Sequence, residues 1–268
     1  MLPLIEAPFR TIILSWHPLR STLWDEVCRK NAGSAFGIAW IFLLPVLFLG
    51  LYSTTYLIIF KVKPANMTPT DYVLFVYIGL LPFLSFSESL GSGVAALMTN
   101  RSVLLNTVFP VELLPLRTVL AAQTTMLVGM AICLAWSGLT GHLTVWVLLL
   151  PVIVAAQTMF LTGAAWLLAP IYVVFRDIGQ IINFIVLAMM IISPIAYRAA
   201  DLDRLGAAWL LARFNPLFYY LISYQSVLFD GVPPPGFAFP IAILLGIVLF
   251  VTGFAFCNRI KVMVADYV

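Results

Sequence analysis

Residues 100–115 read NRSVLLNTVFPVELLP, a short polar island between two long apolar segments. The island holds one arginine, one glutamate, two asparagines and two prolines, whereas the segments on either side are almost entirely apolar. A helix needs about 20 apolar residues to cross a bilayer, and both flanking segments reach that length. The island therefore predicts a connection between two membrane spans, where a polar partner can bind.

The composition of the whole chain points to the same class of protein. Of 268 residues, 63% are hydrophobic and 9% are charged, and the mean hydropathy is +1.07. A soluble domain has about 25% charged residues. Continuous apolar runs of about 20 residues favour helices over a transmembrane barrel, whose strands alternate over ~10 residues. We expect an all-α integral membrane protein, and the small net charge of +3 gives no indication of nucleic-acid binding.

Two units are expected along the chain. Residues 1–35 form an amphipathic segment, because Phe9, Ile12, Ile13 and Trp16 recur at helical spacing opposite a charged face. This pattern predicts a helix in the membrane interface, with a solvated helix packed on a partner as the alternative. Residues 36–268 form a single domain of six transmembrane helices. The expected spans are residues 36–60, 72–97, 116–138, 145–170, 178–197 and 237–257.

Residues 198–235 form the longest interruption between spans. Their apolar pieces are shorter than the ~20 residues that a spanning helix needs, and Asn215-Pro216 separates them. They are therefore predicted to be re-entrant or interfacial helices between spans five and six. Six spans place both termini on one side, which then holds nine of the 14 basic residues. The positive-inside rule predicts cytoplasmic termini, a cytoplasmic island at 100–115 and an outward segment at 198–235.

Several kinds of chemistry find no support in the sequence. The chain has no phosphate-binding loop of the type G-x-x-x-x-G-K-[ST] and no cysteine or histidine cluster with metal-ligand spacing. The cysteines Cys28, Cys133 and Cys257 are far apart and predict no disulfide. We therefore expect no catalytic, metal or cofactor site in this chain, which argues against an integral-membrane enzyme.

Glu88 is the one acid inside a predicted span. A charge at that depth costs about 2.5–3.5 kcal/mol or more, so it faces protein or water. It either lines a polar conduit or is buried and satisfied by nearby serine hydroxyls or by protonation. The aromatic residues of the first span, Phe36, Trp40 and Tyr52 among them, also allow two interpretations. Packing and lipid contact is favoured over a ring-lined path for sugars.

Over nearly its whole length the sequence resembles a known family, the permease subunits of ABC exporters of bacterial surface polysaccharides such as O-antigens, capsules and teichoic acids. The similar residues, in chain order, are Arg29-Lys30, Ser34, Gly37, Trp40, Pro45, Tyr72, Gly79, Pro82, Asn100, Phe109-Pro110, Glu112, Leu114-Pro115, Arg176-Asp177, Ser193-Pro194, Tyr197 and Asn215-Pro216. Gln225 departs from the pattern, because many members of the family carry an arginine there.

The resemblance implies a multi-pass homodimer in the bacterial cytoplasmic membrane, paired with two copies of a separate ATPase subunit. The ATP and Mg would be bound by that partner, and a lipid-linked polysaccharide would pass between the two permeases. The N-terminal helix and the loop after the second span would contact the ATPases. An ABC permease for teichoic acid, lipids or drugs is the first alternative, and an integral-membrane enzyme acting on lipid-linked sugars is a less favoured one. A secondary transporter would more often show an internal repeat, and none is visible.

Three sets of site residues follow from these expectations. The ATPase-coupling set consists of Asn100, Arg101, Leu104, Asn106, Phe109, Pro110 and Glu112. The channel or substrate-path set consists of Phe36, Trp40, Tyr52 and Glu88. The third set, placed to attract anionic lipid headgroups near the membrane interface, consists of Arg10, Arg29 and Lys30.

Overall fold

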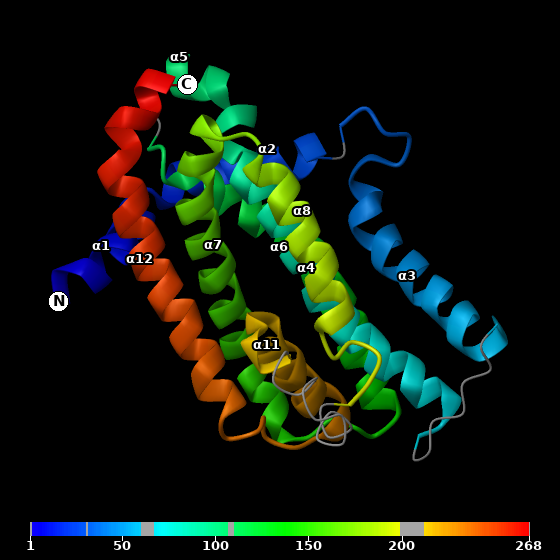
Figure 1. Ribbon diagram of the computed structural model, residues 1–268. Helices are drawn as coiled ribbons and strands as arrows, with labels where there is room; N and C mark the ends of the chain where they lie inside the picture. Colours follow the sequence, from blue (N-terminus) through cyan, green and yellow to red (C-terminus); the bar gives the residue numbers. More distant parts are fainter. Residues whose placement is uncertain (1, 31, 60–66, 107–109, 199–211, 268) are drawn as a thin grey trace.

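The computed structural model describes residues 2–30, 32–59, 67–106, 110–198 and 212–267. Within these ranges the protein is all-helical, without strands (Figure 1). The α-helices are α1 (Leu2–Leu14), α2 (Trp16–Lys30), α3 (Trp40–Ser53), α4 (Pro69–Thr99), α5 (Arg101–Asn106), α6 (Leu113–Leu139), α7 (Leu150–Val174), α8 (Ile178–Ile192), α11 (Pro216–Gln225) and α12 (Ala238–Tyr267). Short 3-10 or π segments extend them at η1 (Gly37–Ala39), η2 (Thr54–Ile59), η3 (Val145–Leu149) and η5 (Ser226–Asp230).

Five helical segments are long and apolar enough to cross a membrane. They are Gly37–Ile59, Pro69–Thr99, Leu113–Leu139, Val145–Val174 and Ala238–Lys261. These segments coincide with the first four and the last of the predicted spans, and they confirm an all-helical protein with five candidate membrane-spanning helices.

The fifth predicted span is shorter than expected. Helix α8 ends at Ile192 instead of residue 197, because Ser193 takes an extended conformation (φ −72°, ψ 140°) before Pro194. A residue that precedes proline is sterically disfavoured in the helical region. With 15 residues, α8 is only about 22 Å long, compared with a bilayer core of about 30 Å. The count of six spans therefore stays a prediction.

Helix α4 is the central element of the bundle. It begins at Thr68, whose hydroxyl accepts a hydrogen bond from the Asp71 backbone N–H at 3.1 Å, and Pro69 occupies the first turn. In its most apolar window 83% of the residues are buried, whereas the corresponding value for the first span, which contains α3, is 12%. Figure 1 shows α3 at the side of the bundle, with α4 among α6, α7 and α8.

Helices α7 and α12 pack unusually closely. Side chains added at Gly163 of α7 or Gly253 of α12 would overlap the backbone of the other helix. Because lipid supplies no hydrophobic driving force between helices, small residues that let backbones approach are a common way to hold them together. These two helices therefore form a rigid pair in the bundle.

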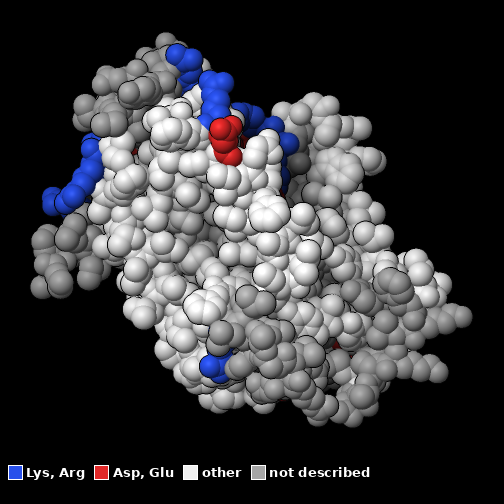
Figure 2. All heavy atoms as spheres, viewed as in Figure 1, with Lys and Arg blue, Asp and Glu red and all other residues white. Residues whose placement is uncertain are grey.

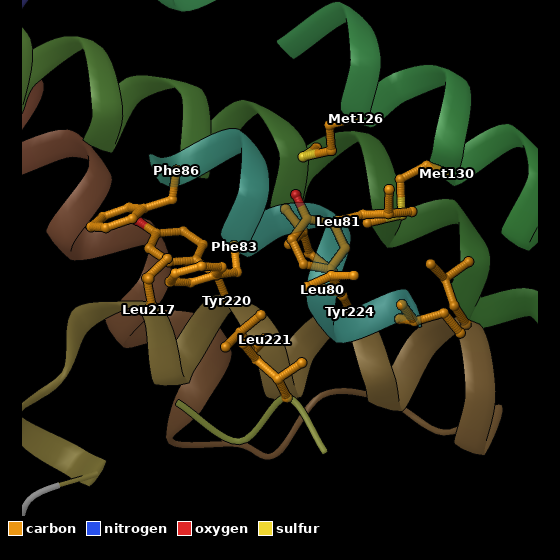
Figure 3. Packing of buried hydrophobic residues seen from close by; sticks show 14 of the residues in the cluster. Leu80, Leu81, Phe83, Phe86, Met126, Met130, Leu217, Tyr220, Leu221 and Tyr224 are labelled. Carbon is orange, nitrogen blue, oxygen red and sulfur yellow. The ribbon is translucent and has the colours of Figure 1, made fainter. Parts of the chain in front are cut away.

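The segment after α8 is partly described. The predicted helical piece at residues 217–229 is observed as α11 and η5, and Asn215 caps it by accepting from the Leu217 N–H at 2.9 Å. Most of α11 is buried, and Figure 3 shows its Leu217, Tyr220, Leu221 and Tyr224 against residues of α4. The predicted piece at residues 207–211 lies outside the described residues, and a re-entrant position in a membrane stays a prediction.

The amphipathic N-terminal segment forms two helices. Helix α2 buries Leu19 and Val27 in clusters that include residues of α6, and it leaves Trp16 and Trp24 exposed. Its apolar side thus packs on the bundle. The division at residue 35 and the interfacial location stay predictions.

Candidate functional site

Charged and polar side chains gather where the end of α4, the start of α6 and helix α2 meet. We call this end of the bundle, which also carries α5, the α5 end, and we call the opposite end the α11 end. On the face drawn in Figure 2, most lysine and arginine side chains lie at the α5 end. Helix α2 thus meets the consecutive helices α4, α5 and α6, although it lies far from them in the sequence.

Asn100 stands at the centre of this end and is turned inward, with 3% of its surface exposed. Its side-chain amide donates to the Ala96 carbonyl at 2.8 Å, which closes α4. Its Oδ1 accepts from Arg117 of α6 at 2.5 Å and lies 3.5 Å from the Arg29 guanidinium of α2. The residue therefore joins three helices, whereas the sequence predicted a position in a loop that contacts the ATPase.

Arg117 and Glu26 extend this junction. Arg117 is buried in the first turns of α6, and its guanidinium lies 3.3 Å from a Glu26 carboxylate oxygen. The same carboxylate accepts from Arg29 at 2.8 and 2.9 Å. A buried charge is tolerated when it is paired and hydrogen-bonded, and here Glu26 and Asn100 supply the acceptors. The result is a network that ties α2 to α4 and α6.

Glu88 forms an ion pair with Lys30, so a second charged contact joins α2 to α4. Both side chains keep about a third of their surface exposed, 35% for Glu88 and 30% for Lys30. The neighbouring Ser92 hydroxyl donates to the Glu88 backbone carbonyl at 2.7 Å, not to its carboxylate. The structure thus gives the Glu88 carboxylate a basic partner, which the sequence did not reveal.

Glu88 borders two cavities. The first has a volume of about 250 Å³ and is lined by Glu26, Arg29, Lys30, Glu88, Ser92, Thr118, Ala121 and Ala122. The second has a volume of about 220 Å³, and its lining includes Glu88 together with Leu44 and Phe48 of α3. Both cavities also touch Ala122 of α6. Space accessible to small molecules therefore lies on both sides of the Glu88 side chain.

The other described residues of the predicted coupling set differ in exposure and in partners. Arg101 is exposed, and Leu104 is half-buried against a cluster that contains Leu97 and Leu114. Glu112 is buried, and its carbonyl accepts from the Trp166 indole of α7 at 2.7 Å. Pro110 accepts at its carbonyl from the Leu113 N–H. The side chain of Asn106 and all of Phe109 lie outside the described residues.

The predicted path residues on the first span are not gathered into one site. Phe36 and Trp40 contact each other edge to face, with centroids 5.7 Å apart, and Tyr52 packs partly buried against the core. None of these three residues lines either of the two cavities at Glu88. The Tyr77 hydroxyl donates to the Pro45 carbonyl at 2.6 Å and joins α3 to α4.

The predicted headgroup set is divided in the structure. Arg29 and Lys30 are engaged with Glu26 and Glu88, whereas Arg10 lies exposed on α1. A groove of about 810 Å³ between α2, α3 and α6 has Arg20 and Trp24 in its lining. The described residues contain no group of three or more histidine, cysteine, aspartate or glutamate side chains that could hold a metal ion.

Comparison with known proteins identifies relatives of this chain, although no family model matches it. An O-antigen export system permease protein RfbA of Myxococcus xanthus is 28% identical over 213 residues, 79% of this chain and 80% of the relative. Two proteins of the same description from Klebsiella pneumoniae are each 25% identical over 240 residues, 88% of this chain and 89% of theirs. The resemblance to permeases of polysaccharide-exporting ABC transporters is confirmed.

Permeases of ABC export systems are transport subunits that work with a partner ATPase subunit. In an exporter permease, the α5 end is notable because the short helix α5, with the exposed Arg101, follows directly on Asn100 and its network of charged side chains. Glu26 and Arg117 were missed in the sequence. Arg117 could have been noticed as a base just inside an apolar span, but its partners come from residues 17 and 91 positions away.

Proposed function

We propose that this chain is the permease subunit of an ABC exporter that moves a lipid-linked surface polysaccharide, of O-antigen or capsular type, across the bacterial cytoplasmic membrane. The ATP is hydrolysed by a separate subunit. The observation that carries the proposal is the similarity, over most of the chain, to O-antigen export permeases. The junction of α2, α4 and α6 beside α5 supports it, because it offers a mechanical connection between a partner at α5 and the spans.

The proposed topology has six spans, with both termini and α5 in the cytoplasm. In Figure 1, α12 finishes beside α5, and α8 leads the chain from the α5 end towards the α11 end. Helix α8 would then act as the fifth crossing despite its length. The concentration of basic side chains at the α5 end agrees with a cytoplasmic location under the positive-inside rule.

The proposed assembly is a homodimer bound to two ATPase subunits. Closure of the ATPases would push on α5 through its exposed Arg101 and through Leu104. The inward-turned Asn100 would not itself contact the partner. It would pass the displacement to α6 through Arg117, and to α2 through Arg29 and Glu26. Packed elements of this kind move as rigid bodies between discrete arrangements.

The proposed substrate path runs past Glu88 and the aromatic side of the first span. The two cavities beside Glu88 support this location, since one reaches the charged junction and the other reaches α3. Phe36, Trp40 and Tyr52 would contact the sugar rings. Arg10, with Arg29 and Lys30 nearby, would favour an anionic headgroup at the cytoplasmic surface.

The test is genetic complementation of a strain that lacks this chain. The wild-type chain should restore one surface glycan, and the identity of that glycan distinguishes O-antigen, capsule and teichoic acid. An Arg101→Glu, Leu104→Asp double variant should insert normally but lose most export and most co-purifying ATPase. Thr252→Ala, exposed on α12, is the matched control and should behave as wild type. Normal surface glycans in the deletion strain would contradict the proposal.

A further inference from the structure

A second polar connection lies in the middle of the bundle, away from the α5 end. Gln157 of α7 is completely buried and uses both ends of its amide. Its Nε2 donates to the Pro82 carbonyl of α4 at 3.0 Å, and its Oε1 accepts from the Tyr224 hydroxyl of α11 at 2.8 Å. One side chain thus links α4 to α11, and the two residues that it joins, Pro82 and Tyr224, are 142 positions apart in the chain.

Pro82 is the point at which α4 is most easily bent. Proline lacks the N–H that would continue the helical hydrogen bonds, and its ring crowds the preceding turn, so helices kink there. The half of α4 beyond Pro82 runs to Asn100 and α5, and the half before it runs towards the α11 end. A change in bend at Pro82 would alter the position of one half relative to the other.

Helix α11 lies directly against the Pro82 segment of α4. Figure 3 shows Tyr220 and Tyr224 beside Leu80, Leu81 and Phe83, the residues that flank Pro82. One turn earlier, Gly79 leaves room for α11, because a Cβ there would come 2.9 Å from the Gln225 side-chain nitrogen. The Pro82 segment of α4 and helix α11 therefore share one interface.

The remaining polar contacts fix α11 to the other helices. Gln225 donates to the Pro194 carbonyl after α8 at 2.9 Å, and Tyr220 donates to the Ala242 carbonyl of α12 at 2.8 Å. These side chains are almost completely buried. Leucine or phenylalanine would fill such positions without any need for hydrogen-bond partners. Directional hydrogen bonds instead fix one register between the helices, which apolar packing alone does not.

We propose that Gln157 and Tyr224 are positioning residues that couple the bend of α4 at Pro82 to the position of α11. A displacement that enters at α5 would pass along α4 to Pro82 and then through Gln157 to α11 at the opposite end. This inference rests on the proposed function as a transporter driven from the α5 end. It adds the connection through which the α11 end responds to ATP.

The experiment uses the permease purified with its ATPase and reconstituted in vesicles. Tyr224→Phe removes a single hydroxyl and keeps the ring, and Gln157→Leu removes both hydrogen bonds. Losing one interior hydrogen bond should lower the amount of glycan exported per ATP hydrolysed about two- to tenfold, while the ATPase rate changes little. Tyr219→Phe is the matched control, since its hydroxyl donates to the Arg213 carbonyl at an exposed position.

A labelling measurement follows α11 directly. Phe214, exposed next to α11, is replaced by cysteine in a Cys28→Ser background, where the remaining cysteines are buried. ATP should change the rate of maleimide labelling at residue 214, and Tyr224→Phe should abolish that change.

The outcomes separate this inference from the proposed function. If the wild-type complex neither binds its ATPase nor exports a glycan, the proposed function fails. If the wild-type complex exports but labelling at residue 214 does not respond to ATP, the coupling of α11 is wrong. The same conclusion follows if Tyr224→Phe lowers export and ATPase activity equally, since that indicates a structural role. Should Gln157→Leu not fold, the milder Tyr224→Phe still decides.

Discussion

The two ends of the bundle are held together by different kinds of contact. At the α5 end, α2, α4 and α6 are joined by the charged side chains of Arg117, Glu26 and Arg29, which meet at the neutral Asn100 amide. At the α11 end, the described residues contain one ion pair, Arg198–Asp230 at 2.9 Å, and α11 is otherwise anchored by neutral tyrosine, asparagine and glutamine side chains.

This difference in contacts indicates that the two ends of the bundle have different mechanical roles. Charged groups act over several ångströms and tolerate small displacements, so a junction built from them can shift without losing its attraction. Neutral hydrogen bonds weaken steeply when their geometry changes. The α5 end is therefore suited to receive a displacement, and the α11 end is suited to hold defined positions.

The largest effect is expected at the centre of the charged junction. Arg117→Ala should deprive Glu26 and Asn100 of their buried partner, while Arg29 remains beside both. Hydrogen bonds to charged groups contribute about 1.5–3 kcal/mol each. The expected result is a clear fall in the melting temperature of the detergent-purified protein and in the amount recovered from membranes. Arg20→Ala, an exposed base on α2, should leave both unchanged. A wild-type melting temperature for Arg117→Ala would show that the junction contributes little to stability.

An intermediate effect on stability is expected at the α11 end. Asn215 caps α11 and also donates from Nδ2 to the Ser193 hydroxyl at 2.8 Å. Removing a helix cap costs about 0.5–2 kcal/mol, so Asn215→Ala should lower the melting temperature less than Arg117→Ala does. Asn215→Asp keeps the cap acceptor and should recover part of the loss. If the melting temperature fell as much as in Arg117→Ala, the expectation that the charged junction contributes more to stability than the α11 end would be contradicted.

The smallest effect on stability is expected for Lys30 and Glu88. Both are about one-third exposed, and partly solvated ion pairs contribute only about 0.2–1 kcal/mol. Export should be more sensitive, since both Lys30→Glu and Glu88→Lys place like charges together. If the pair acts only by joining α2 to α4, the double charge exchange should restore export. If Glu88 lines the substrate path, the exchange should restore stability but not export.

The sequence predicted elements better than contacts. Spans followed directly from apolar runs, but α4 begins at Pro69, three residues before the predicted span, because Thr68 caps it. The end of α8 was placed five residues too late, because its apolar pattern continues past Ser193 although proline stops the helix. Local chemistry of this kind can be read from neighbouring residues.

The charged junction could not be predicted in the same way. Asn100 reads as a loop residue, and only the approach of α6 and α2 turns it into a buried acceptor. Glu88 suggested either a conduit or serine partners, and its actual partner, Lys30, lies 58 positions earlier in the chain. Such pairs depend on how the helices cross, which the apolar pattern does not encode.

The close crossing of α7 and α12 has a practical consequence for following motion in this protein. Because Gly163 and Gly253 bring the two backbones into contact, the pair should keep its internal geometry while α3 and α4 move. A fluorophore at Leu244, exposed on α12, would therefore serve as the fixed reference point in a distance measurement, with the second dye on α3 at Leu51. The close glycine crossing thus makes α12 the reference position from which movement of α3 can be measured.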